Sequence, residues 1–254
     1  GLGGEMKTLI KNGKIIKKEN QLIEAALWLE NGVIHAIGES FDEADFEQVF
    51  DAKGQLITPG LVDVHVHFRE PGFTYKETIK TGSKAAARGG FTTVCAMPNL
   101  NPVPDTAEKL SEVYDLIQKD AVVKVLQYAP ITEELRSEVL TNQKALKEAG
   151  AFAFTNDGVG VQTAGTMYLA MKEAAALNMA LVAHTEDESL LFGGVMHEGE
   201  VSKKLGLPGI LSATEASQIA RDITLAKETG VHYHVCHVST EESVRVIRDA
   251  KKAG

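Results

Sequence analysis

The sequence is poor in cysteine, in positive charge and in long apolar stretches. Only two cysteines occur among 254 residues, and Cys95 and Cys236 fall in predicted strands far apart along the chain, so no disulfide framework is expected. No apolar run is long enough to cross a bilayer, and the N-terminus has no signal-peptide core. The net charge of −9 argues against a nucleic-acid-binding face. We therefore expect a cytoplasmic protein with no membrane and no nucleic-acid partner.

Residues 6–58 have the pattern of a small β region. Short apolar runs such as "TLIKNGKII" and "AALWLENGVIHAIGE" are broken by Asn-Gly and Gly turns, which is typical of hairpins. After Pro59-Gly60 the pattern changes, and apolar runs alternate with amphipathic stretches. This change predicts a second region over residues 59–254.

The second region has the alternation of an α/β protein. Nearly continuous apolar strands between amphipathic helices indicate a parallel sheet that helices cover. The predicted strands are 61–67, 92–97, 122–128, 151–154, 180–184 and 232–238, and the predicted helices lie near 75–88, 106–119, 133–148, 164–177, 214–229 and 241–252.

Such a sheet is either doubly wound or closed into a (β/α)8 TIM-type barrel. No glycine-rich phosphate loop follows the first strand, which disfavours a dinucleotide-binding sheet. Polar residues gather instead at the C-terminal ends of several strands, where a barrel builds its active site. We therefore predict the barrel, although only about six strand–helix units precede Gly254 and a closed barrel needs eight. The sequence is then either a fragment or a partial record of the barrel.

Two histidines stand in the first strand of the predicted barrel, in "DVHVHFREPG". Residues i and i+2 of a strand point to the same side, so His65 and His67 form a pincer suited to a metal such as zinc. The alternative is one histidine of the core and one of the surface. Asp63 could hydrogen-bond within the strand or to the small region.

Further metal-ligand side chains follow later strands. Asp157 comes after the fourth strand, His184 ends the fifth and His237 lies near the end of the sixth. Five such side chains at one rim favour a metal site, although Asp157 alone could be a turn residue because Asp-Gly is a common turn pair.

Two residues near this rim could bind an anion. Arg69 can grip a carboxylate through two parallel hydrogen bonds, and its alternative is a surface salt bridge, for example with Glu70. Asn99 follows the second strand and could add an amide, or it could simply form the turn in "PNLNPVP".

These segments together resemble the bacterial dihydroorotases of the amidohydrolase superfamily. The resemblance rests on "DVHVHFREPG", "KETIKTGSKAAARGGFTTVCAMPN", "EAGAFAFTNDGVGVQTAG", "VAHTEDESL", "GGVMHEGE" and "HYHVCHVSTEESVRVIRDAKKAG" and runs from about Met6 to the last residue. It implies reversible cyclisation of N-carbamoyl-L-aspartate to L-dihydroorotate, a step of pyrimidine (UMP) synthesis, with a metal-activated hydroxide as nucleophile. Residues 6–58 would be part of a composite small domain.

The resemblance also assigns roles to single residues. His65, His67 and Asp157 would bind one metal, and Asp157, His184 and His237 the second, with one or two zinc ions per subunit. Some family members bridge the metals with a carboxylated lysine, but the fourth strand has none, so Asp157 is expected to bridge. Arg69 and Asn99 fall where the family holds the substrate carboxylate.

The sequence differs from the family pattern at several positions, and other functions remain as alternatives. The family often has Thr, Asp and Cys where Leu100, Asn156 and Thr185 stand, and tuning of the site is expected from these changes. The family's proton-transfer aspartate has no match up to Gly254, so a barrel that ended there would turn over no substrate. A homodimer is common in the family. The rivals are an allantoinase or hydantoinase, whose substrates lack the carboxylate for Arg69, and a non-catalytic scaffold subunit of an aspartate transcarbamoylase.

Overall fold

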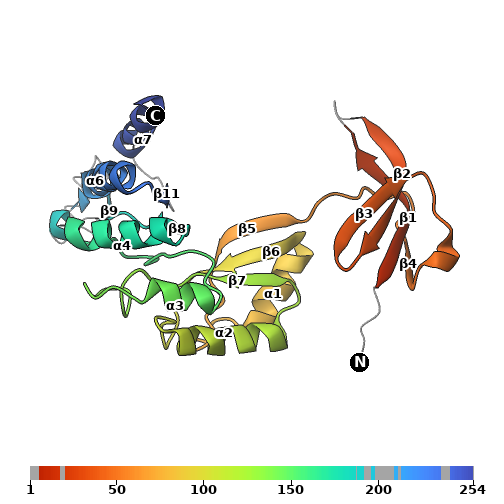
Figure 1. The fold of residues 1–254 in the computed structure, drawn as a ribbon, viewed down its shortest axis with the longest axis horizontal. Helices are drawn as coiled ribbons and strands as arrows, with labels where there is room; N and C mark the ends of the chain where they lie inside the picture. Colours follow the sequence, from red (N-terminus) through yellow and green to blue (C-terminus); the bar gives the residue numbers. More distant parts are fainter. Residues whose placement is uncertain are drawn as a thin grey trace. The chain divides into compact units, whose positions relative to one another are not determined.

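The computed structural model describes residues 6–17, 21–186, 188–191, 196–197, 209–210, 213–235 and 241–253. The chain divides into two units, Gly1–Gly60 and Leu61–Gly254 (Figure 1). None of the helices in these described ranges combines the length and the apolar character that a membrane span requires.

The first unit is a four-stranded sheet in the order β3-β2-β1-β4. Asn31 and Gly32 join β2 to β3 with φ values of 50° and 79°, the left-handed backbone that a two-residue hairpin turn requires. The rings of Phe41 and Phe46 pack edge-on against Trp28, with centroids 5.7 and 5.5 Å away. The sheet pairs β1 antiparallel with β2 and parallel with β4, and its strands are β1 (Lys7–Ile16), β2 (Leu22–Glu30), β3 (Val33–Gly38) and β4 (Gln48–Asp51), with a short helix η2 (Glu43–Asp45) before β4.

The second unit alternates strands and helices in the described residues. Its elements in chain order are β5 (Leu61–Val66), α1 (Ile79–Arg88), β6 (Phe91–Ala96), α2 (Ala107–Asp120), β7 (Lys124–Gln127), α3 (Gln143–Glu148), α4 (Ala164–Ala176), β8 (Ala180–Ala183), η3 (Glu188–Leu190), β9 (Met196–His197), β10 (Gly209–Ile210), α6 (Ala213–Thr229), β11 (His232–Val235) and α7 (Glu241–Ala253).

The described strands of this unit pair in parallel, and β5, β6 and β7 are neighbours in chain order. One sheet has the order β5-β6-β7, and a second pairs β8 with β11, each with parallel neighbours. The segment around Phe154 connects them through parallel bridges to Ala129 and to Leu181. Its backbone N–H and C=O both bond to the β8 side, because Phe154 N donates to Ala180 O (3.1 Å) and Val182 N donates to Phe154 O (2.8 Å). The predicted fourth strand is therefore present as a short bridge, and the unit is α/β as predicted.

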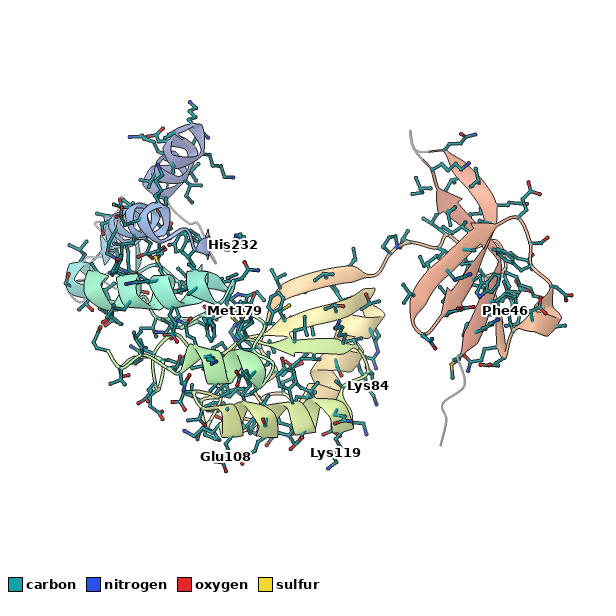
Figure 2. The ribbon with its side chains drawn as sticks, viewed as in Figure 1. Phe46, Lys84, Glu108, Lys119, Met179 and His232 are labelled. Carbon is teal, nitrogen blue, oxygen red and sulfur yellow. The ribbon has the colours of Figure 1, made fainter. Side chains whose placement is uncertain are left out.

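Helices cover one face of the β5–β7 sheet. Figure 1 shows α1 and α2 along this face, and Ile79 of α1 and Val113 of α2 pack with Val94 and Val125 of the strands. Figure 2 shows Glu108 and Lys119 on the side of α2 away from the strands, where both are exposed. A second core packs Phe154 and Leu181 against α3 and α4. The amphipathic patterns thus place the apolar stripe of each helix on the sheet.

The predicted helix over 133–148 is wrong in its first part. Only α3 at its end is helical, with Asn142 as the N-cap, while Glu134 and Leu135 have φ values of 57° and 69°. The amide of Glu134 donates to Asp105 Oδ2 (3.0 Å), so a contact with a distant loop holds the segment out of a helix. The N-cap of α2 is Thr106, and the Asp105 carboxylate binds both this loop and Lys109.

Candidate metal centre

The two histidines of the first parallel strand meet at its C-terminal end. β5 ends at Val66, and the rings of His65 and His67 lie with their centroids 4.9 Å apart. Their Nε2 atoms face each other at 3.0 Å. The pairing of β5 with β6 changes register between Asp63 and Val66, within this stretch. The two imidazoles therefore share one side, as the i, i+2 spacing predicts.

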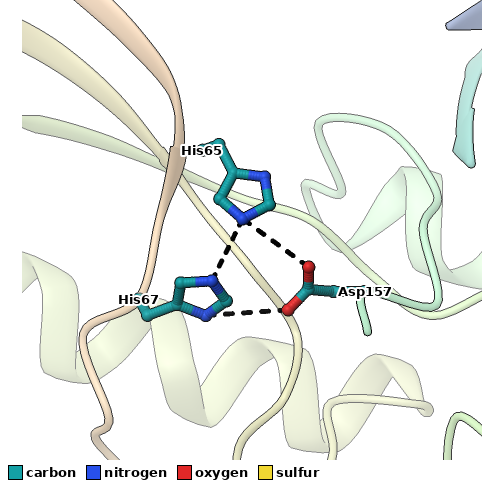
Figure 3. Close-up of side chains that lie close together, drawn as sticks. All are labelled: His65, His67 and Asp157. Carbon is teal, nitrogen blue, oxygen red and sulfur yellow. Dashed lines mark hydrogen bonds and ion pairs between the residues drawn. The ribbon is translucent and has the colours of Figure 1, made fainter. Parts of the chain in front are cut away.

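Asp157 joins this pair from the loop after the Phe154 segment. Its carboxylate is buried, with 8% of the residue exposed. Asp157 Oδ1 lies 3.6 Å from His65 Nε2 and Asp157 Oδ2 lies 3.6 Å from His67 Nδ1 (Figure 3). Gly158, with a φ of 80°, turns the chain directly after the carboxylate. Two distant segments of the sequence thus place three ligand side chains together.

Neighbouring polar groups orient both histidines. Asp63 Oδ1 accepts a hydrogen bond from the His65 amide (3.0 Å), so this aspartate acts within its own strand, one of the alternatives the sequence left open. The oxygen Oδ1 of Asn99 lies 2.9 Å from His67 Nδ1. Because an amide oxygen only accepts, this contact places the proton of neutral His67 on Nδ1 and leaves the Nε2 lone pair directed towards His65.

The loop of Asp157 is fixed by the residue before it. Asn156 Oδ1 accepts from the amides of Ile131 (2.8 Å) and Thr132 (3.1 Å), and Asn156 Nδ2 donates to Thr132 Oγ1 (2.8 Å). All three bonds are buried. From the sequence, Asn156 stands out only as a departure from the family, because its partners lie more than 20 residues away and leave no local signal.

The donor set fits a metal ion. His65, His67 and Asp157 each offer one possible ligand atom, and these three atoms lie within 4.8 Å of one another. They form a candidate metal-binding group within the described part of the chain. Two imidazole nitrogens with a carboxylate oxygen are the ligands of many mononuclear and dinuclear centres. The geometry supports a metal-binding site at the C-terminal end of β5.

The sequence matches one family over most of its length. The family described as "Dihydro-orotase-like" matches residues 54–243. The chain belongs to the dihydro-orotase-like family.

The curated relatives that match this chain are longer than the chain itself. The chain is 61% identical to a dihydroorotase of Ligilactobacillus salivarius over 97% of its own length and 58% of the relative's, and 59% identical to a dihydroorotase of Halalkalibacterium halodurans over 98% and 58%. A dihydroorotase of Listeria monocytogenes is 56% identical over 97% and 58%. The dihydro-orotase-like chain therefore spans somewhat more than half the length of the curated relatives it matches.

Solved structures similar to this chain include hydantoinases. A D-hydantoinase is 26% identical with a TM-score of 0.74 over 98% of this chain and 56% of that one. The L-hydantoinase of Arthrobacter aurescens has a TM-score of 0.77 at 23% identity, over the same shares, which shows the fold alone. The dihydro-orotase-like chain thus shares its α/β architecture with these hydantoinases.

Of the other two predicted ligands, His184 is described by the structure and does not belong to the group of three. His184 follows β8 directly, and its Nε2 lies 3.5 Å from Glu186 Oε2. His237 lies outside the described residues. The structure therefore brings together three of the five predicted ligands, and the roles of His184 and His237 stay predictions.

The loop of Arg69 lies beside the loop of Asn99. Arg69 has a φ of 63°, and its carbonyl oxygen accepts from Phe73 N (2.8 Å). The Asn101 amide donates to Pro71 O (3.3 Å), which ties the two loops together. Glu70 does not serve as a salt-bridge partner in this arrangement but accepts from the Ile79 amide at the start of α1 (3.1 Å).

A hollow opens next to His65. It has a volume of about 330 Å³ and is lined mainly by apolar side chains, with His65, His234 and Tyr128 among the polar ones. This size is in the range of small-molecule sites. His234, to which the sequence analysis gave no role, thus lies on the same hollow as His65.

Proposed function

We propose that the protein is a dihydroorotase that interconverts N-carbamoyl-L-aspartate and L-dihydroorotate in pyrimidine synthesis. The observation that carries the proposal is the group of His65, His67 and Asp157 in a chain 61% identical to a curated dihydroorotase. Because the chain spans 58% of that relative, the activity is proposed for the whole protein.

We assign zinc to the metal centre, with one or two ions per subunit. His65, His67 and Asp157 would hold one ion, and Asp157 would share a second with His184 and His237. A bound zinc would supply a nucleophilic water at neutral pH and polarise the amide carbonyl. The bond between Asn99 and His67 supports this assignment, since it leaves His67 Nε2 free of a proton.

We assign the substrate carboxylate to Arg69, with Asn99 beside it. A guanidinium grips a carboxylate with two parallel hydrogen bonds and so fixes its orientation as well as its charge. The loops of Arg69 and Asn99 are joined by the bond from Asn101 N to Pro71 O, which supports a shared role at the rim beyond His67. The side-chain amide of Asn99 would then contact both His67 and the substrate carboxylate.

The wider arrangement follows from the same proposal. The parallel order β5-β6-β7 and the parallel pair of β8 with β11 support a (β/α)8 barrel of which residues 59–254 form part, and residues 6–58 would belong to a composite small domain. We place the protein in the cytoplasm and propose that it is a homodimer. An aspartate transcarbamoylase is the further partner that we propose for it.

Turnover with a matched pair of histidine variants tests the proposal. His67→Asn removes a proposed ligand, whereas His35→Asn changes a half-exposed histidine that packs on Trp28 in the other unit. We expect the wild type and His35→Asn to hydrolyse dihydroorotate with equal rates and equal zinc content. His67→Asn should lose at least about 100-fold in rate together with metal, as losses of ligands or their partners do.

The same assay separates the alternatives. Turnover of allantoin or hydantoin without turnover of dihydroorotate would replace the proposal by another cyclic amidohydrolase, the activity named for the structural neighbours. Absence of both zinc and turnover in the wild type would leave the non-catalytic scaffold. Arg69→Lys should raise the KM for dihydroorotate far more than it lowers the zinc content.

A further inference from the structure

A buried glutamine of α6 holds the backbone of the loop that follows β8. Gln218 is 2% exposed. Its Oε1 accepts from the Glu186 amide (2.7 Å), and its Nε2 donates to the Glu186 carbonyl (3.1 Å). One side chain thus satisfies both backbone groups of Glu186, as a neighbouring strand would.

A second glutamine joins this loop to the loop that follows Asp157. Gln162 Nε2 donates to Gly160 O (2.7 Å) and to Glu186 O (2.9 Å). Gln162 Oε1 accepts from the Glu188 amide (2.9 Å). The amide group of Gln162 therefore spans the two loops.

The surroundings of Gln218 leave no room for a side chain at position 160. A Cβ at position 160 would collide with the side chain of Gln218, so the glycine is required for the close approach. Arg221 Nη1 donates to Gln162 O (3.1 Å), while Arg221 Nη2 pairs with the buried Asp222 (2.8 Å). The contact is therefore anchored on two successive turns of α6.

Each loop begins at a proposed metal ligand. The first runs from Asp157 to Gln162 and the second from His184 to Glu188. We propose that Gln218 and Gln162 form a glutamine clamp that fixes the spacing between Asp157 and His184. They are positioning residues, because they act on the ligands through the backbone. The inference rests on the proposed metal site and extends it to residues that hold the site in shape.

Metal affinity tests the clamp against a matched control. Gln218→Met keeps the length of the side chain and removes both hydrogen bonds. Gln143→Met likewise keeps the length of a glutamine that is 0% exposed, and it removes the hydrogen bond from Gln143 Nε2 to Ala170 O (3.0 Å) between α3 and α4. In chelator competition with zinc, we expect the dissociation constant of Gln218→Met to rise about 10-fold and that of Gln143→Met to stay within about 2-fold of the wild type. Equal affinities for both variants would overturn the proposal, even if both proteins melt at lower temperatures.

Amide exchange separates failure of the clamp from failure of the proposed function. In metal-free protein, Gln218→Met should speed hydrogen exchange at the Glu186 amide at least about 10-fold, and Gln162→Met should do so at the Glu188 amide. Gln143→Met should change neither. Unchanged exchange at both amides would refute the clamp whatever the activity. If the wild type binds no zinc while exchange responds as expected, the proposed metal site fails and the clamp stands as a link between the loops only.

Discussion

We expect removal of the Asn156 side chain to lower the free energy of unfolding by several kcal/mol, because it makes three buried hydrogen bonds. Asn156→Ala leaves the buried amides of Ile131 and Thr132 without their acceptor, and Thr132 Oγ1 without a donor. An orphaned buried amide costs about 1–3 kcal/mol, so two of them predict a loss of about 2–6 kcal/mol in the free energy of unfolding. With partial relief by entering water, we expect about 3 kcal/mol, or a fall of about 6–12 °C in melting temperature for a domain of this size.

Asn156→Asp is the matched variant. A carboxylate accepts from both amides, and the hydroxyl of Thr132 can rotate to donate to it. All three hydrogen bonds can then be kept, so we expect a change of no more than about 1 kcal/mol at neutral pH. This agrees with the tuning that the sequence analysis expected where the family often has aspartate.

Urea unfolding followed by circular dichroism and tyrosine fluorescence measures both variants, because the one tryptophan of the sequence, Trp28, lies in the first unit. The slope with urea should stay unchanged, because the same surface is exposed on unfolding. An Asn156→Ala protein within about 1 kcal/mol of the wild type would refute the reasoning, since the amides would then be satisfied without this side chain. A large loss for Asn156→Asp would show that the buried charge beside Asp157, together with the lost donation by Nδ2, outweighs the retained acceptance from the two amides.

Three further predictions concern other parts of the chain. Burial raises the pKa of the Cys95 thiol to about 11, so only on the order of one thiol in a thousand is ionised at pH 8; iodoacetamide should label the Cys95 peptide in urea and leave it unlabelled in folded protein. Burial also raises the pKa of Asp222, so its contribution to stability is fully present below its ordinary pKa of about 4 and is lost as the pH rises through the raised value. The non-ionisable Asp222→Asn should remove this fall from urea midpoints measured between about pH 4 and pH 7, and an identical slope in both proteins would contradict the assignment. Gly72→Ala places a Cβ against the Asn101 backbone at a φ of 99°, whereas the Cβ of Gly230→Ala, at a φ of 74°, meets nothing within 4 Å. Gly72→Ala should therefore lower the melting temperature clearly more than Gly230→Ala. Equal shifts would mean that the strain of a positive φ, and not the contact with Asn101, sets the loss of stability.

Local patterns predicted most of the elements but not all of their ends. The strand at His65 and the helices near 107–120 and 164–176 follow from apolar periodicity, which depends only on nearby residues. The helix predicted over 133–148 failed in its first ten residues because Glu134 donates its amide to Asp105, almost 30 residues earlier. A tertiary hydrogen bond of this kind overrides local propensity and cannot be read from the segment itself.

The sequence by itself determined the chemistry of the centre. The i, i+2 spacing of His65 and His67 at a strand end, and an aspartate in the turn after a later strand, follow from strand geometry and the parallel arrangement. Only the tertiary structure decided what supports these ligands. Asn99 on His67, Asn156 on the loop of residues 131–132, and Gln218 on Glu186 all act across gaps of more than 20 residues. Amide side chains have no periodicity of their own, and the partners of Asn156 and Gln218 include backbone groups that any residue provides, so these roles exist only once the chain has folded.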